Sequence, residues 1–290
     1  MSRLPSRLRV GPIEFRFSGE SARALRYTYW AYRDFFLPEG SDAVQPEPLA
    51  TLPIHLLSQR PARPSRPPDF AAGRNWAAWD LDTQWLFCSG YYERARPRFA
   101  CALAKDWSGA KLAVDGDGAD APLRYPIDQI LTWGLLGRCG GLLVHGAATE
   151  RDGTAMVFAG RSGAGKSTLS SLCLDAGWRI LNDDRNIVYP RAGEWRVGGT
   201  PWHGSGCYAE HRDATLGAIY LLAQSPVDRI ETIPCREARM ELLDVSAIPW
   251  FEEDWSARTL AALERVTEQV PVHRFHFTKT SDAVKTLTES

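Results

Sequence analysis

The sequence lacks the features of several protein classes. Lys plus Arg total 34 and Asp plus Glu total 35, so no overall positive charge is present to attract nucleic-acid phosphates. No stretch approaches the roughly 20 apolar residues of a membrane-spanning helix. Residues 1–14 contain arginines without the apolar segment of a signal peptide. We therefore expect a cytoplasmic protein that binds neither nucleic acid nor membrane.

Patterns typical of resident metal sites are missing as well. The cysteines form no CxxC pair, which argues against zinc and thioredoxin-type motifs and predicts free, mostly buried thiols: Cys88, Cys101, Cys139, Cys173, Cys207 and Cys235. The run DGDGAD at 115–120 lacks the Glu that closes an EF-hand loop, so we interpret it as a solvated turn. Four histidines lack a nearby third ligand in a supporting pattern: His203, His211, His273 and His276.

Lysine is scarce, which draws attention to the lysines that are present. Only five of the 34 basic residues are Lys: Lys105, Lys111, Lys166, Lys279 and Lys285. Lys166 lies inside a glycine-rich segment, where this chain places lysine rarely. Hydrophobic residues at 44% and charged residues at 24% are typical of globular proteins, and 290 residues favour about two domains.

The first domain is expected over residues 1–124 and to be of mixed α+β type. Its predicted helix carries apolar residues at helical spacing over Ala22 to Phe36. Prolines between 38 and 68 prohibit a long helix there. Alternating or short apolar runs predict strands, the last three as a meander: Ile13 to Phe17, Leu52 to Leu57, Trp76 to Leu81, Thr83 to Ser89 and Phe99 to Lys105.

The second domain is expected over residues 125–290 as an α/β domain. A helix over Pro126 to Cys139 ends at a Gly-Gly pair. Strands and a helix then alternate as in layered α/β folds: Leu142 to Thr149, Ala155 to Ala159, Lys166 to Ala176 (the helix), Arg179 to Leu181 and, near the end of the chain, Val270 to Phe277.

A P-loop lies between the strand ending at Ala159 and the helix beginning near Lys166. The sequence GRSGAGKS satisfies GxxxxGK[ST], and its strand-to-helix context is the one the motif requires. Lys166 is expected to reach the β and γ phosphates of ATP, and the Ser167 hydroxyl to bind Mg²⁺. The expected nucleotide-binding residues are Gly160, Arg161, Ser162, Gly163, Ala164, Gly165, Lys166, Ser167 and Thr168.

Two adjacent acids and a histidine are the expected catalytic partners of Lys166. Asp183 and Asp184 follow the short strand Arg179 to Leu181, which we expect to neighbour the P-loop strand. One acid can bind Mg²⁺ while the other accepts the proton of an attacking hydroxyl. His145 lies late in the strand Leu142 to Thr149 and could contact the acids or the γ phosphate.

Three segments of the chain, taken in order, resemble the catalytic domain of HPr kinase/phosphorylase and of HPr-kinase-like serine kinases. They are His145-Gly146, GRSGAGKST and Leu181-Asn182-Asp183-Asp184. The resemblance covers roughly residues 140–222. It implies a fold related to phosphoenolpyruvate carboxykinase, a Mg²⁺-ATP donor, a Ser hydroxyl acceptor and a homo-oligomer. It also implies that His145 supports the site, Asp184 is the general base and Asp183 is the metal-side neighbour.

The segment after the acids departs from that family. The glycine-rich segment with a metal-binding Glu has no clean counterpart, and GTPWHGSG at 199–206 stands in its place. This loop could face the acceptor, with Glu210 as a possible substitute metal ligand; an ordinary surface loop is an equal alternative. No phosphorolysis segment is found, which argues against reverse dephosphorylation.

Three functions therefore stay open. The leading one is transfer of the γ phosphate of ATP to a Ser hydroxyl of a protein or modified peptide, such as a lasso-type peptide, with the first domain presenting the acceptor. The second is a small-molecule hydroxyl kinase, although such chains usually begin with the P-loop, and about 155 residues precede it here. The third is a P-loop ATPase without an acceptor.

Overall fold

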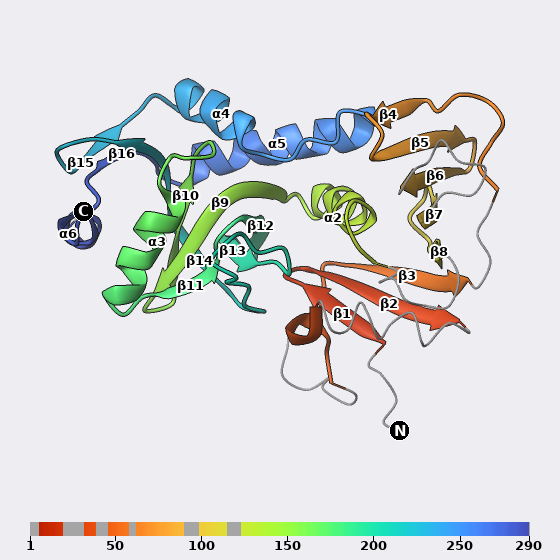
Figure 1. The fold of residues 1–290 in the computed structure, drawn as a ribbon, viewed down its shortest axis with the longest axis horizontal. Coiled ribbons are helices and arrows are strands. Elements are labelled where there is room, and N and C mark those ends of the chain that lie inside the picture. Colours follow the sequence, from red (N-terminus) through yellow and green to blue (C-terminus); the bar gives the residue numbers. More distant parts are fainter. Residues whose placement is uncertain are drawn as a thin grey trace. The chain divides into compact units, whose positions relative to one another are not determined.

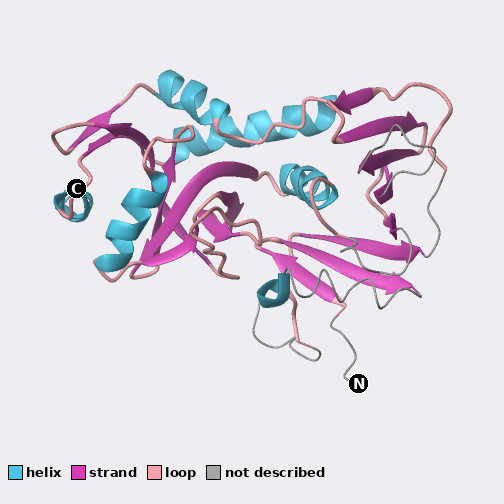
Figure 2. Cartoon of the chain, viewed as in Figure 1, coloured by secondary structure: helices cyan, strands magenta, loops and turns pink. Residues whose placement is uncertain are grey.

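The computed structural model describes residues 6–19, 32–38, 46–57, 62–89, 99–114 and 123–289. Two compact units divide the chain: Met1–Arg9 with Ile13–Thr132, and Val10–Pro12 with Trp133–Ser290. The division falls inside helix α2 (Ile127–Arg138). The domain boundary expected after Arg124 stays a prediction. Each unit contains an eight-stranded sheet, and helices accompany the strands, so the chain is of mixed α/β type (Figures 1 and 2).

The first unit is built on one sheet and a short 3-10 helix, η1 (Arg33–Phe35). Its strands pair in the order β1 (Arg7–Val10), β2 (Ile13–Gly19), β3 (Ala50–Leu57), β8 (Ala110–Val114), β7 (Phe99–Ala104), β6 (Gln84–Ser89), β5 (Trp76–Leu81) and β4 (Phe70–Ala72). The expected meander is confirmed, since β5, β6 and β7 are neighbouring antiparallel strands. Most of the helix expected over Ala22 to Phe36, and the run at 115–120, lie outside the described residues.

The second unit carries a sheet whose path closes on itself. Pairings join β10 to β9, β9 to β12, β12 to β13, β13 to β14 and β14 back to β10, and β14 also pairs with β16. The elements in chain order are β9 (Leu142–Arg151), β10 (Thr154–Ala159), α3 (Lys166–Asp175), β11 (Arg179–Asn182), β12 (Arg185–Arg191), β13 (Glu194–Gly199), β14 (Asp213–Gln224), β15 (Arg229–Thr232), α4 (Cys235–Asp244), α5 (Glu253–Gln269), β16 (Val272–Phe277) and α6 (Asp282–Glu289).

Two apolar cores fix this sheet between helices. One cluster joins β9, β10 and β14 to α4 and α5, through residues such as Val144, Leu242 and Leu263. The other joins β10, β14 and β16 to α3 and α6, through residues such as Phe158 and Leu169. Burial on both faces of the sheet explains the nearly continuous apolar runs of β10 and β14. The loop after β10 lies where that strand ends, at the rim of the sheet.

The sequence analysis expected the strand that precedes the two acids to neighbour the P-loop strand, and this prediction was wrong. β11 pairs with β9, antiparallel, and lies on the opposite edge of β9 from β10. Both edges of β10 are already occupied, because a two-residue turn at Asp152-Gly153 folds β9 onto one edge and β14 pairs in parallel along the other. The connection through α3 therefore passes over β9.

Candidate active site

The loop after β10 has the backbone shape that a phosphate-binding loop requires. Gly163 and Gly165 have φ of +83° and +105°, which residues with a side chain rarely adopt. A Cβ on Gly165 would lie 2.4 Å from the Phe277 ring, so β16 packs directly against the loop. α3 begins at Lys166, and the first N–H groups of a helix lack intrahelical partners. The loop and the helix start are thus suited to binding phosphate oxygens.

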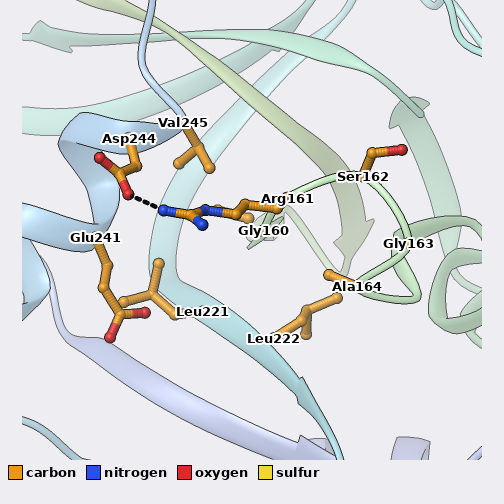
Figure 3. A pocket seen from close by; sticks show the side chains of 11 residues that line it. Gly160, Arg161, Ser162, Gly163, Ala164, Leu221, Leu222, Glu241, Asp244 and Val245 are labelled. Atoms are coloured by element: carbon orange, nitrogen blue, oxygen red, sulfur yellow. Dashed lines mark hydrogen bonds and ion pairs between the residues drawn. The ribbon is translucent and has the colours of Figure 1, made fainter.

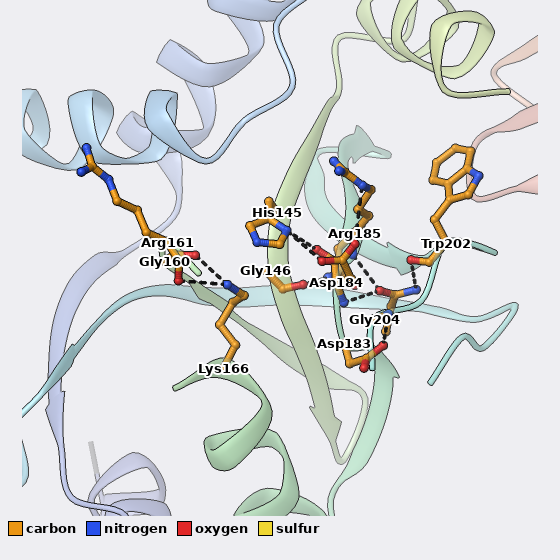
Figure 4. A network of polar contacts seen from close by, with 12 residues as sticks. His145, Gly146, Gly160, Arg161, Lys166, Asp183, Asp184, Arg185, Trp202 and Gly204 are labelled. Atoms are coloured by element: carbon orange, nitrogen blue, oxygen red, sulfur yellow. Dashed lines mark hydrogen bonds and ion pairs between the residues drawn. The ribbon is translucent and has the colours of Figure 1, made fainter. Parts of the chain in front are cut away.

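Lys166 is turned back into the loop. Its Nζ donates to the carbonyl oxygens of Gly160 at 2.7 Å and Arg161 at 3.2 Å (Figure 4). Burial lowers the pKa of the Lys166 ammonium, and the negative charge of Asp184 opposes that shift. These carbonyls are neutral acceptors that anionic phosphate oxygens can replace, because hydrogen bonds between charged groups are stronger.

Asn182 orients the two acids, and the sequence analysis gave it no role. It is fully buried, and its Oδ1 accepts from the backbone N–H of Asp184 at 2.7 Å and of Arg185 at 2.8 Å. Its Nδ2 donates to the carbonyl of Thr200 at 2.8 Å. An Asn side chain that bonds the backbone two and three residues later closes a tight turn. An Asn directly before an acid pair at a strand end is the sequence signal that could have identified this turn.

Asp183 is held by the loop that follows β13. Its carboxylate accepts from the N–H of Gly204 at 2.7 Å and of Gly206 at 2.6 Å, and the residue is 5% exposed. A Cβ on Gly204 or Gly206 would lie 3.0 or 2.7 Å from Oδ2 of Asp183. Glycine at both positions therefore lets the backbone reach the acid. Each carboxylate oxygen keeps acceptor capacity for a cation.

Asp184 forms a pair with His145. His145 Nδ1 lies 3.0 Å from Oδ1 of Asp184 and 3.1 Å from its carbonyl oxygen (Figure 4). Since an ionised carboxylate and a carbonyl are both acceptors, Nδ1 carries the proton. The hydrogen bond from His145 is the main cause that lowers the pKa of the Asp184 carboxyl; burial opposes it, and the charges of His145, Arg185 and Lys166 add to it. Asp184 is therefore ionised at neutral pH.

One cavity of about 370 Å³ brings most of the predicted site residues together. All four predicted catalytic residues line it, with Ser162, Gly163, Gly165, Ser167 and Thr168 of the P-loop. Gly204, Ser205, Gln224 and Lys279 also line it and were not predicted as site residues. No single motif contains them, because Ser205 lies in the loop after β13, Gln224 ends β14 and Lys279 follows β16.

The rest of the P-loop faces a second cavity, of about 470 Å³. Gly160, Arg161 and Ala164 line it together with Asp244 of α4, and Ser162 and Gly163 line both cavities. The Arg161 guanidinium points to the Asp244 carboxylate, with Nη2 2.7 Å from Oδ2 (Figure 3). Arg161 does not line the first cavity; its carbonyl oxygen accepts a hydrogen bond from Lys166 Nζ.

The residues at the cavity fit a Mg²⁺ ion bound jointly with substrate phosphates. Asp183 and Ser167, the predicted ligands, line the same cavity. Within the described ranges, no group of three or more His, Cys, Asp or Glu side chains is arranged to hold a metal ion by itself. Mg²⁺ commonly takes one or two protein ligands and completes its shell with phosphates and water. Glu210, the possible substitute ligand, instead pairs with Arg179, Oε2 to Nη1 3.2 Å.

The other features from the sequence have local roles. All six cysteines are free thiols; Cys88, Cys101 and Cys173 are buried, while Cys207 and Cys235 are exposed. His276 pairs with Glu231, Nε2 to Oε2 2.8 Å. Every helix in the described part of the chain is too short or too polar to traverse a lipid bilayer.

Comparisons with known proteins give a family match over part of the chain. A family model described as "SynChlorMet cassette protein ScmC" matches residues 132–269, which include the P-loop, His145 and the acid pair. No curated protein matches the chain. Among solved structures, the Hpr(Ser) kinase/phosphatase from Coxiella burnetii is similar, with 15% sequence identity and a TM-score of 0.31 over 51% of this chain and 93% of that chain.

Proposed function

We propose that the protein is an ATP-dependent kinase of the HPr-kinase-like type, which transfers the γ phosphate of ATP to a Ser hydroxyl of a protein or peptide. The observation that carries this proposal is the convergence of Lys166, His145, Asp183 and Asp184 with the P-loop on one cavity. A P-loop by itself serves many nucleotide-binding proteins. An ionised, hydrogen-bonded acid facing it adds the group that hydroxyl activation needs.

The P-loop and Lys166 bind the triphosphate in this proposal. The ammonium leaves the carbonyls of Gly160 and Arg161, 2.7 and 3.2 Å away, for the β and γ phosphate oxygens. Ser167 and Asp183 would hold Mg²⁺, which neutralises charge on the phosphates when bound. The amides of Gly204 and Gly206 fix the direction of the Asp183 carboxylate.

Asp184 is the general base and His145 its positioning residue. The acceptor Ser Oγ–H donates its proton to the Asp184 carboxylate while Oγ forms a bond to the γ phosphorus. The bond from that phosphorus to the bridging oxygen breaks, and ADP leaves with the electron pair. The N–H of His145 Nδ1, 3.0 Å from Oδ1, keeps the carboxylate ionised and aimed.

The acceptor is a Ser in a protein or a modified peptide, such as a lasso-type peptide. Support for a macromolecular acceptor comes from the first unit, which forms a separate eight-stranded sheet of its own. We assign acceptor binding to residues 1–124 on this ground. Deleting them should leave nucleotide binding intact and remove transfer.

The test is a transfer assay on the full chain. Protein, ATP and Mg²⁺ are incubated with candidate peptides and proteins encoded near its gene and, in parallel, with a panel of sugars and alcohols. Phosphate transfer is read by mass. The proposal expects transfer to a Ser hydroxyl that requires Mg²⁺ and is abolished together with nucleotide binding by Lys166→Ala.

Two outcomes would overturn it. Turnover of a sugar or alcohol with no peptide modified would assign a small-molecule kinase. Rapid ATP hydrolysis that no acceptor changes and that Asp184→Asn leaves intact would assign an ATPase. Lys285→Ala is the matched control, because Lys285 is exposed and pairs with Asp282 on α6, away from the cavity.

A further inference from the structure

Lys279 is a second lysine at the phosphate-binding cavity. It follows β16 and lines the cavity with Lys166, Ser167 and Thr168. Lys105 and Lys285 pair with Asp80 and Asp282, at 2.5 and 2.6 Å. Lys279 has no ion-pair partner among the residues the structure describes. An exposed, unpaired lysine that faces a cavity is available to an anionic ligand.

The turn that carries Lys279 is held in place by a contact with the P-loop and by hydrogen bonds to the segment after β14. The Phe277 ring occupies the space that a Cβ on Gly165 would need, 2.4 Å away. Thr278 donates its N–H and its hydroxyl to the Asp228 carboxylate, at 2.5 and 2.9 Å. The carbonyl of Phe277 accepts from the N–H of Ser225 at 3.0 Å. The backbone that bears Lys279 is therefore positioned before any ligand arrives.

The strand pairings place Lys279 across the P-loop from the acids. β10 has β9 on one edge and β14 on the other. Asp183 and Asp184 follow β11, beyond β9, whereas Lys279 follows β16, which pairs with the far edge of β14. Gln224, at the end of β14, lies on the same side and donates from Nε2 to the carbonyl of Gly163 at 2.7 Å. The strand order thus puts this lysine on the opposite side of the P-loop strand from Asp184.

Charge balance gives this lysine a role. The charged side chains that line the cavity are Asp183 and Asp184 against Lys166 and Lys279, with His145 beside them. Without Lys279, one ammonium would face two carboxylates, and a nucleoside triphosphate is itself negative even with Mg²⁺ bound. A second cation on the side away from the acids balances the carboxylates without neutralising the base.

Building on the proposed function, we infer that Lys279 binds the α or β phosphate of the nucleotide and that it sets affinity without taking part in phosphate transfer. The site takes nucleoside di- and triphosphates alike, since the group it contacts is common to both. Gln224 holds the adjoining edge of the P-loop in place.

The experiment measures ATP and ADP binding by calorimetry with Mg²⁺, and transfer kinetics, for wild type, Lys279→Ala, Lys279→Arg and the control Lys285→Ala. We expect Lys279→Ala to weaken ATP and ADP binding equally, by about tenfold, as for one charge-assisted contact. The KM for ATP should rise with kcat within about twofold. Lys279→Arg should restore affinity to within about threefold, and Lys285→Ala should match wild type.

Two results would overturn the inference and leave the proposed function standing: unchanged affinity in Lys279→Ala, or a loss for ATP with none for ADP, which would put the lysine at the γ phosphate. A wild-type protein that binds neither nucleotide would instead reject the proposed function. Because Lys279 is exposed, its replacement should not alter folding; a thermal melt of each variant checks this.

Discussion

The two sides of the P-loop strand β10 differ in chemistry. The acid side, defined by β9 and β11, presents His145, Asp183 and Asp184, each held by hydrogen bonds to backbone or to one another. The lysine side, defined by β14 and β16, presents Gln224 and Lys279 and contributes no acid to the cavity. The acids are held in place, whereas the lysine has no ion-pair partner among the described residues. In the proposed function, the acid side therefore performs phosphate transfer and the lysine side binds the nucleotide.

This difference has kinetic consequences. A group that acts only in the transition state lowers kcat when removed and leaves nucleotide affinity alone, whereas a group that binds substrate and transition state equally changes KM. Substitutions on the acid side should therefore change kcat, and Lys279→Ala should change KM. The following variants test that division.

Asp184→Asn should have the largest effect on transfer. The amide cannot accept the Ser proton, so we expect kcat to fall by about 10² or more while the Kd for ATP stays within about twofold. Stopped transfer assays and calorimetry measure the two quantities on one preparation. Normal transfer in this variant would mean that another group is the base.

His145→Ala should have the next largest effect, about tenfold on kcat. The Nδ1 hydrogen bond lowers the pKa of Asp184, so the wild-type carboxylate stays ionised as the pH falls. Without that bond the pKa rises, and the activity that depends on the ionised acid is lost at a higher pH. The acid limb of the kcat profile should therefore move upward in pH.

The matched variant for His145 is Asn. Its amide nitrogen lies about where Nδ1 does and can donate the same hydrogen bond, so His145→Asn should recover part of kcat and return the acid limb toward wild type. An acid limb that is identical in wild type and His145→Ala would show that this hydrogen bond does not control the base.

Local motifs of the site could be predicted from the sequence, and pairings across the sheet could not. The P-loop, its flanking strand and helix, and the strands of the meander follow from spacing within short segments. The partner of β11 depends on which strand edges are free, and in this fold β9 and β14 occupy both edges of β10. No pattern within residues 179–184 shows which strand edges are available for pairing.

The groups that surround the acids could not be predicted from the sequence for a similar reason. The amides that hold Asp183 come from Gly204 and Gly206, more than twenty positions later, and a GSG sequence is equally typical of a surface loop. Lys279 lies 113 positions after Lys166 and belongs to no motif. Long-range contacts of this kind are set by the packing of β16 on Gly165.

Gly206→Ala should have a moderate effect, a loss of several-fold in kcat with a higher Mg²⁺ requirement. The new Cβ would lie 2.7 Å from Oδ2 of Asp183 and 2.9 Å from the Tyr208 ring, so the loop must shift and release the carboxylate. Transfer measured against Mg²⁺ concentration reads this directly. Gly109→Ala is the control, since the nearest atom to its Cβ is a carbonyl oxygen at 3.5 Å; equal Mg²⁺ curves in both variants would contradict a metal-side role for Asp183.

Asp244→Asn should have the smallest effect. It removes the ion pair with Arg161, whose side chain is 83% exposed and faces the second cavity rather than the phosphate site. Exposed pairs contribute little, so we expect ATP affinity and kcat each to change by less than about fivefold. A larger loss of ATP affinity, measured by calorimetry, would mean that α4 holds the P-loop in its binding shape. The lysine side would then include α4, and binding would depend on a helix distant in sequence from the motif.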